Sequence, residues 1–304
     1  MKYDLLTILG PTAVGKTAVA ARVAARANGE ILSGDSRQVY CGMDIGTGKD
    51  LDDYVVDEKK IAYHLIDIVA AGEKYNVHRY QKDFLEAYSN ILKRQKTPIL
   101  CGGSGMYIEA VTKGYALPEV PANEKLRNEL EQKSDTELIA LLESLKETHN
   151  VSDIDSRKRM IRAIEIALFF KEHSQEYRDY PSISTLFVGL TLPTEQRRKR
   201  ITDRLHQRLQ TGMIEEVERL LQQGINPEDL LYYGLEYKFL TLYLTRKITY
   251  DEMVAQLNTA IHQFAKRQMT WFRGMERKGT TIHWIDASLP LDEKVEQILE
   301  LWSK

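Results

Sequence analysis

The sequence of 304 residues predicts an α/β fold, in which a parallel sheet flanked by helices is interrupted by a helical insertion. Three observations support this prediction. Short apolar runs alternate with helical patterns through the first 115 residues. Residues 116–182 carry helical patterns rich in Lys, Glu and Leu, without a convincing strand. The apolar run at 184–192 then predicts a return to the sheet.

The strongest local signal lies near the N-terminus. Residues 5–9 (LLTIL) predict a strand, and the alanine-rich segment 18–27 predicts a helix. Between them, residues 10–17 (GPTAVGKT) match the G-x-x-x-x-G-K-[ST] pattern, which predicts a P-loop NTPase-like core. Loop N–H groups and the N-terminus of the helix then converge on an anion of the diphosphate type. The motif is typical of nucleotide and ATP binding, but it does not by itself identify the molecule that carries the diphosphate.

Within this loop, Lys16 is expected to reach the outer phosphate and Thr17 is expected to ligate Mg²⁺. Mg²⁺ is the one cofactor that the sequence predicts. The expected diphosphate-binding residues are Gly10, Pro11, Thr12, Ala13, Val14, Gly15, Lys16 and Thr17.

Two further strands deliver polar loops to the same place. Residues 30–33 predict a strand that runs into Asp35-Ser36-Arg37-Gln38, and residues 98–101 predict one that runs into 102–105 (GGSG). Residues 64–68 (HLIDI) predict another strand, and Asn76 is expected to cap the helix that follows. Because the carboxyl ends of parallel strands meet at one edge, these loops should lie beside the phosphate loop.

The remaining chain is expected to be mostly helical. Residues 1–115 and 183–304 are expected to form the catalytic core, and residues 116–182 the insertion domain. Helices are predicted in the insertion at about 123–133, 135–148 and 153–173. Later helices are predicted at 194–211, 213–223, 234–246 and 249–273, before a short strand (TIHWI) and a closing helix.

Composition narrows the class of protein. The chain is 43% hydrophobic and 28% charged with a net charge of −2, so a nucleic-acid partner requires a local basic surface. Two cysteines without a C-x-x-C pattern argue against a zinc module or disulfide framework, and favour a reducing cytoplasm. The core strand begins at residue 5 and no apolar run approaches membrane-spanning length, so we expect neither a leader peptide nor membrane association.

Several polar residues could carry chemistry. A carboxylate at Asp35 could orient Mg²⁺ or accept a proton, or it could simply cap a turn. Arg37 and Gln38 beside it are suited to recognising a nucleobase or a phosphate. The Ser104 hydroxyl could contact a phosphate or a reacting amine, although a plain turn is equally consistent with the pattern.

Two dense basic runs stand in the C-terminal part. The first is EQRRKRITDRLHQR at 195–208, and the second is KRQMTWFRGMERK at 266–278, which interleaves cations with Trp271 and Phe272. Lys158, Arg159 and Arg162 form a smaller group in the insertion. Such runs suit either a solvated helix face or a groove that follows a nucleic-acid backbone with stacking platforms.

Six motifs occur together in a characteristic order. They are GPTAVGKT, DSRQVYCGMDIGTGK, YHLIDI, GGSGMYIEAV, KRMIRAIEI and AKRQMTWFRG. In this order they resemble the bacterial tRNA dimethylallyltransferases, also called tRNA isopentenylpyrophosphate transferases. The resemblance extends from residue 5 to about 274.

The resemblance implies that the loop holds the diphosphate of dimethylallyl diphosphate and not a nucleoside triphosphate. This family transfers the dimethylallyl group to the exocyclic amine (N6) of the adenine 3′-adjacent to the anticodon in tRNA, releasing pyrophosphate. The implied catalytic residues are Asp35 as the base, Ser104, Lys16, and Thr17 with Mg²⁺. The enzyme is then expected to be a cytoplasmic monomer.

The resemblance also implies contacts with the tRNA anticodon stem-loop. The implied tRNA-binding residues are Asp35, Ser36, Arg37, Gln38, Ser104, Arg127, Lys158, Arg159, Arg162, Lys266, Arg267, Gln268, Thr270, Trp271 and Arg273. Two segments depart from the family pattern: Lys158 replaces a glutamine, and Gly234-Leu235-Glu236-Tyr237-Lys238 stands where G-Y-[KR]-E is common.

Three other functions use the same motif. A kinase of nucleotides or small metabolites would hold ATP in the loop. A relative of the family would prenylate free adenylates. A binding module would grip RNA without chemistry, and salt-sensitive RNA binding without a product would identify it.

Overall fold

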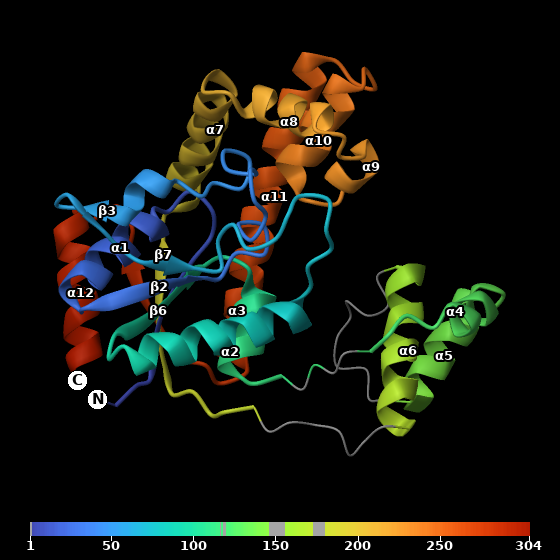
Figure 1. Ribbon diagram of the computed structural model, residues 1–304, viewed down its shortest axis with the longest axis horizontal. Helices are drawn as coiled ribbons and strands as arrows, with labels where there is room; N and C mark the ends of the chain where they lie inside the picture. The colour runs from blue at the N-terminus through green and yellow to red at the C-terminus, as the bar shows by residue number, and fades with distance from the viewer. Residues whose placement is uncertain (1, 116, 118–119, 146–155, 173–179) are drawn as a thin grey trace. The chain divides into compact units, whose positions relative to one another are not determined.

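The computed structural model describes residues 2–115, 117, 120–145, 156–172 and 180–304, drawn in colour in Figure 1. The chain divides into two compact units. The core unit comprises Met1–Tyr115 and Ser182–Lys304, and the insertion unit comprises Ala116–Pro181.

A six-stranded parallel sheet forms the centre of the core unit, in the order β5-β2-β6-β1-β7-β8. Its strands are β1 (Leu5–Leu9), β2 (Gly29–Ser33), β5 (Tyr63–His64), β6 (Thr97–Gly102), β7 (Thr185–Thr191) and β8 (Ile282–Asp286). In the register, Ile8 of β1 lies opposite Cys101 on one side and Val188 on the other. The predicted α/β fold with a parallel sheet is thus confirmed.

Helices cover both faces of this sheet (Figure 1). The connection from β1 to β2 through α1 (Lys16–Arg26) runs towards one edge of the sheet. The connection from β5 to β6 through α2 (Val77–Lys93) runs towards the other edge. Since such crossovers are right-handed, the two helices lie on opposite faces. The closing helix α12 (Leu291–Ser303) packs beside α1, and α3 (Gly105–Thr112) packs beside α2. Buried apolar side chains between α1, α12 and the sheet form the main core, including Ile8, Val23, Ile99, Val188 and Ile298.

The helices that follow β7 form a second layer of the core unit. They are α7 (Thr194–Gln210), α8 (Met213–Gln222), α9 (Pro227–Leu230), α10 (Leu235–Leu244) and α11 (Tyr250–Arg277). The longest, α11, begins at a capping box in which Thr249 and Glu252 satisfy each other's backbone N–H groups. It packs against α3, α7 and α10, so one helix joins this layer to the loops at the sheet edge.

The insertion unit is helical, with α4 (Glu124–Glu131), α5 (Asp135–Leu145) and α6 (Arg157–Glu172) around a small apolar core that includes Leu138, Leu142 and Ile164. Beside that core lies the buried Glu165 carboxylate, which accepts hydrogen bonds from the Asn123 N–H at 2.6 Å and from Arg127 at 3.0 and 3.1 Å. The predicted helix ends at 146–148, 153–155 and 173 lie outside the described residues.

The predicted strand at 64–68 is wrong beyond His64. Its backbone turns at Leu65 and Asp67, whose φ angles of 65° and 56° are left-handed and cannot continue a strand. The sequence patterns also did not predict α3, α9, the 3₁₀ turn η1 (Leu51–Tyr54) or the hairpin of β3 (Val55–Val56) and β4 (Lys59–Lys60). No helix among the described residues is both long and apolar enough to cross a membrane.

Candidate active site

Three loops meet at the carboxyl edge of the sheet, as the sequence predicts. The loop after β6 is hydrogen-bonded to the loop after β2, since the Gly34 N–H donates to the Cys101 carbonyl at 2.8 Å and the Ser104 N–H donates to the Gly34 carbonyl at 3.2 Å. A Cβ at Gly102 would collide with the Gly34 backbone, so only glycine permits this approach. The polar residues that follow β2 and β6 are therefore held side by side.

The phosphate loop curls tightly between β1 and α1. Gly15 and Ala13 have left-handed φ angles of 77° and 63°. For Ala13, which carries a Cβ, this conformation costs about 1–2 kcal/mol. The Lys16 ammonium donates to the Pro11 carbonyl at 2.7 Å, and α1 has no acidic residue in its first turn. The loop and the positive end of α1 are suited to an anion, and the expected contacts of residues 10–17 with a diphosphate stay predictions.

Burial lowers the pKa of Lys16 to about 8. Among the nearby charges, Arg204 lowers this pKa further, whereas Asp35 and Asp50 raise it. Arg204, Asp35 and Asp50 thus all lie within electrostatic reach of the Lys16 ammonium. A lysine that is destabilised as a cation gains most from an anion bound beside it.

The Asp35 carboxylate caps a turn, which was one of the roles predicted for it. Its Oδ1 accepts the Arg37 N–H at 2.9 Å. The Ser36 N–H donates to the Ser104 hydroxyl at 3.0 Å, so this hydroxyl joins the loop after β2 to the loop after β6. The chemical roles of Asp35 and Ser104 stay predictions.

Gln38 is tied into the fold at both ends of its amide. Its Oε1 accepts a hydrogen bond from the Ser33 hydroxyl at 2.7 Å, and its Nε2 donates to the Gly48 carbonyl at 3.0 Å. Both ends of the amide therefore hold the loop in place. Base recognition by Gln38 stays a prediction.

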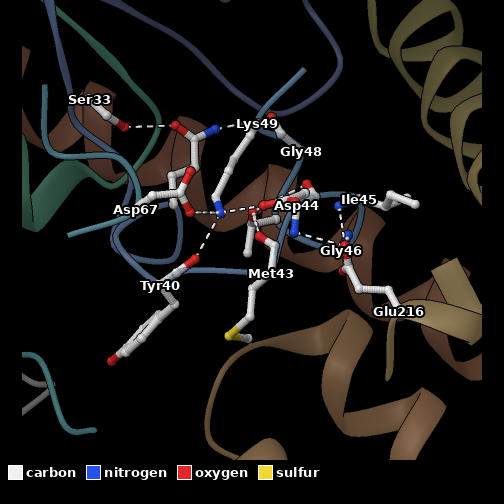
Figure 2. Close-up of polar contacts among 12 residues, drawn as sticks. Ser33, Tyr40, Met43, Asp44, Ile45, Gly46, Gly48, Lys49, Asp67 and Glu216 are labelled. Carbon is white, nitrogen blue, oxygen red and sulfur yellow. Dashed lines mark hydrogen bonds and ion pairs between the residues drawn. The ribbon is translucent and has the colours of Figure 1, made fainter. Parts of the chain in front are cut away.

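Figure 2 shows the buried Lys49 ammonium beside this loop. Lys49 donates to the Tyr40 carbonyl at 2.8 Å and to Asp44 at 2.6 Å, and it also pairs with Asp67. Asp67 is one of the two residues after β5 with left-handed φ angles, where the chain leaves the strand predicted at 64–68. The ion pair with Lys49 thus forms at the point where that prediction is wrong.

Glu216 of α8 fixes the opposite side of the same loop (Figure 2). Its buried carboxylate accepts the N–H groups of Asp44, Ile45 and Gly46 at 2.8, 2.7 and 3.0 Å, and the Tyr237 hydroxyl at 2.7 Å. Neither Lys49 nor Glu216 was predicted from the sequence. The motif DSRQVYCGMDIGTGK contains Lys49, but nothing local identifies Glu216, which is 170 residues away from Gly46.

Arg204 and Arg208 of the first basic run both turn towards Asp50. Their guanidinium groups lie 3.4 and 3.0 Å from the Asp50 carboxylate. They line a cavity of ≈ 430 Å³ together with Lys49 and Asp50. Since Arg204 also affects the pKa of Lys16, it extends the positive field of the phosphate loop.

An aromatic group stands beside Arg37. The Arg37 guanidinium lies 5.1 Å from the ring centroid of Tyr232, whose side chain is 55% exposed. Next to it, Tyr233 is buried against Tyr40, and its hydroxyl accepts the Gly72 N–H and donates to the Glu73 carbonyl, both at 2.8 Å. Tyr232 precedes the segment Gly234–Lys238 that departs from the family pattern and belongs to none of the six motifs, so it was not predicted from the sequence.

The second basic run forms an exposed face on α11. Lys266, Arg267, Thr270, Trp271 and Arg273 are exposed, whereas Gln268 is buried. The pKa of Arg197 at the start of α7 is lowered by burial and by the cations Arg273 and Arg198. We call Arg197, Arg198, Lys266, Arg267 and Arg273 the basic surface.

The other predicted tRNA contacts lie in the insertion unit. Lys158 and Arg159 are exposed on α6. Arg127 and Arg162 both pair with Glu165, and Arg162 also donates to the Val120 carbonyl at 2.8 Å. Their contacts with tRNA stay predictions.

The residues of the loop fit Mg²⁺ in its usual mode in phosphate sites. Among the described residues, no group of three His, Cys, Asp or Glu side chains could hold a metal. Mg²⁺ at phosphate sites keeps several waters and is held largely by phosphate oxygens, and in loops of this pattern a Ser or Thr hydroxyl is its protein ligand. A single hydroxyl ligand, Thr17 at the start of α1, is compatible with that mode.

Comparisons with known proteins agree with the motifs. A model of the IPP transferase family matches residues 38–275. The chain is 59% identical over 300 residues to tRNA dimethylallyltransferase 2 of Phocaeicola vulgatus, which covers 99% of this chain and 98% of that relative. The solved tRNA isopentenylpyrophosphate transferase of Bacillus halodurans is 32% identical, with a TM-score of 0.71, over 99% of this chain and 96% of that one.

A solved eukaryotic dimethylallyltransferase acting on tRNA has a TM-score of 0.73 at 24% identity, over 93% of this chain and 73% of that one. At that identity the likeness shows a shared fold alone. The family match and the 59% identity over nearly the full length are decisive. They confirm the resemblance seen in the sequence: this chain belongs to the IPP transferase family.

Proposed function

We propose that this protein is a prenyltransferase that modifies tRNA: it transfers the dimethylallyl group of dimethylallyl diphosphate to N6 of the adenine 3′-adjacent to the anticodon. The observation that carries the proposal is the hydrogen-bonded union of the Asp35 and Ser104 loops at the sheet edge that holds the phosphate loop. A diphosphate site and a candidate base are then available to one reaction.

In the proposed reaction, the bond between C1 of the dimethylallyl group and the diphosphate oxygen breaks, and its electron pair leaves with pyrophosphate. A bond forms between C1 and N6 of the adenine. The lone pair of this amine is delocalised into the ring, so the amine needs help to lose a proton. We assign Asp35 as the base that receives this proton.

The leaving group needs stabilisation as negative charge develops on it. Lys16 and the loop N–H groups are suited to this, and Arg204 adds a cation to the same field. When bound at Thr17, Mg²⁺ would neutralise part of the diphosphate charge. The remaining role of the loop is to orient C1 towards the amine.

The target adenine must leave the stack of the anticodon loop to reach a site at the sheet edge. We propose that Arg37 and Tyr232 receive a base there, because an exposed aromatic ring beside a guanidinium is a suitable stacking platform. The basic surface would contact phosphates of the same stem-loop. We assign the insertion unit to the stem-loop as well, through Lys158 and Arg159, and we expect a monomer that acts where tRNA is found, in the cytoplasm.

The direct test is incubation with unmodified tRNA, Mg²⁺ and labelled dimethylallyl diphosphate, followed by mass analysis of the nucleosides. A prenylated adenosine 3′ to the anticodon is the expected product. Label in free adenylates and none in tRNA would contradict the proposal. ATP turnover without a prenylated product would reassign the loop to a nucleotide.

A further inference from the structure

Gln268 differs from its neighbours in the basic run on α11. Lys266, Arg267 and Thr270 are exposed, but Gln268 is only 6% exposed. Its side chain therefore points into the core unit and away from the face that these neighbours present. The resemblance assigns Gln268 to tRNA together with these neighbours, so the orientation of this one residue requires a separate explanation.

Both ends of the Gln268 amide are bonded to loops of the active site. The Oε1 atom accepts the Thr12 N–H at 2.9 Å, and the Nε2 atom donates to the Gly103 carbonyl at 2.9 Å. A Cβ at Gly103 would collide with Gln268 Nε2, so a glycine makes room for the amide. One side chain of α11 thus connects the phosphate loop to the loop that carries Ser104.

The bond to Thr12 falls at the part of the phosphate loop that needs support. Thr12 stands between Pro11, whose carbonyl accepts the Lys16 ammonium, and Ala13, whose backbone is left-handed. A strained backbone of this kind persists only where its surroundings determine it. Because the Thr12 N–H is directed to Gln268, it orients the loop and is not one of the donors that face the diphosphate.

We propose that Gln268 is a positioning residue for the phosphate loop and that it sets the affinity for the diphosphate without contacting RNA. The identity of the substrate, dimethylallyl diphosphate, rests on the proposed function. The hydrogen bonds by which Gln268 holds the loop do not depend on that function. Gln268 acts through Thr12 and Gly103, so replacing it should weaken binding of the diphosphate. Replacing a residue that contacts tRNA should weaken binding of tRNA instead.

The test replaces Gln268 by methionine, which has a similar volume but makes neither hydrogen bond. In Gln268→Met, we expect the KM for dimethylallyl diphosphate and the Kd for inorganic pyrophosphate to rise by about 5- to 10-fold, the value of one or two lost hydrogen bonds. The KM for tRNA should stay within about twofold, since no exposed group changes. Pyrophosphate binding is measured by calorimetry, and thermal unfolding shows that the variant is folded.

Matched variants separate the alternatives. Lys266→Ala should show the opposite pattern, a raised KM for tRNA and an unchanged Kd for pyrophosphate. Thr259→Ala removes an exposed hydroxyl that donates to the Ala255 carbonyl of its own helix, and it should change neither. Gly103→Ala should reproduce the pyrophosphate effect from the other end of the bond, and it tests the proposal if Gln268→Met does not fold.

A raised KM for tRNA with unchanged pyrophosphate binding in Gln268→Met would overturn the proposal, and so would an equal rise for both substrates. If the wild-type protein makes no prenylated tRNA, the proposed function fails. In that case, weakened pyrophosphate binding in Gln268→Met would still support the positioning role, and unchanged binding would still refute it.

Discussion

At the scale of single residues, the protonation of Lys16 should govern diphosphate binding. Burial places the pKa of this residue at about 8, well below the ordinary lysine value of 10.5. The ammonium that attracts the diphosphate is therefore present below this pH and is lost as the pH rises through it. We expect kcat/KM for dimethylallyl diphosphate to fall above about pH 8, because this ratio reports the pKa values of the free enzyme. A pH profile of the Lys16→Arg variant should lack this fall, and a flat wild-type profile from pH 7 to 9 would contradict the assignment.

The proposed base gives a second prediction at this scale. Asp35→Asn preserves the shape of the side chain and an oxygen that can accept the Arg37 N–H, but it cannot take a proton. We expect kcat to fall by about 10²- to 10⁴-fold, the usual contribution of a general base. The Kd for pyrophosphate, measured by calorimetry, should change little. Full turnover in Asp35→Asn would exclude Asp35 as the base.

Tyr232 provides a third prediction, on base recognition. Tyr232→Ala removes the ring beside Arg37 and should raise the KM for tRNA by about 5- to 100-fold, the value of one stacked base. Tyr232→Phe should retain nearly all of the affinity because it keeps the ring. Tyr250→Ala is the control, since Tyr250 is also an exposed tyrosine but begins α11. Equal tRNA affinity of Tyr232→Ala and the wild type would remove Tyr232 from the site.

At the scale of elements, the loop after β2 is held by buried charges at both of its sides. Lys49 holds it from one side and Glu216 of α8 from the other. Lys49→Met should lower the free energy of unfolding by about 3 kcal/mol, because Asp44 and Asp67 would lose their cation. Urea unfolding measures this change, with Lys199→Met as a control whose exposed pair with Asp203 contributes little. A loss no larger than that of the control would show that the loop is held in other ways.

Sequence patterns predicted elements far better than they predicted the direction of individual side chains. The sheet was predictable because strands such as LLTIL are short, apolar and followed by turn residues, and because parallel strands share one edge. The end of β5 was not predictable, because HLIDI has the pattern of an apolar strand. The chain instead turns at residues with left-handed φ angles, where Asp67 forms a tertiary ion pair with Lys49.

The same limit applies to the candidate site. The motifs identified every loop that meets at the sheet edge. They could not distinguish Gln268 from Lys266, because the side of α11 that is buried depends on packing against α3 and the phosphate loop. Arg204 was missed for a similar reason: a basic run on a helix does not reveal that one of its cations faces an aspartate 154 residues earlier in the chain.

At the scale of the whole molecule, a chain with net charge −2 must bind RNA through a local concentration of cations. If the basic surface contacts phosphates, tRNA affinity should fall steeply with salt, and Arg273→Ala should reduce the slope of log K against log salt by about one unit. Filter binding at several salt concentrations measures this slope. An unchanged slope would move the RNA away from α11.

The order of strands in the sheet has a consequence for how the protein emerges from the ribosome. Strand β1 pairs with β7, about 180 residues later, and the phosphate loop is tied to α11 across 256 residues. The insertion unit, in contrast, is one continuous segment whose contacts are local. Local contacts form early and distant ones late. We therefore expect nascent chains to fold the insertion first and to acquire diphosphate binding only after α11 has been synthesised.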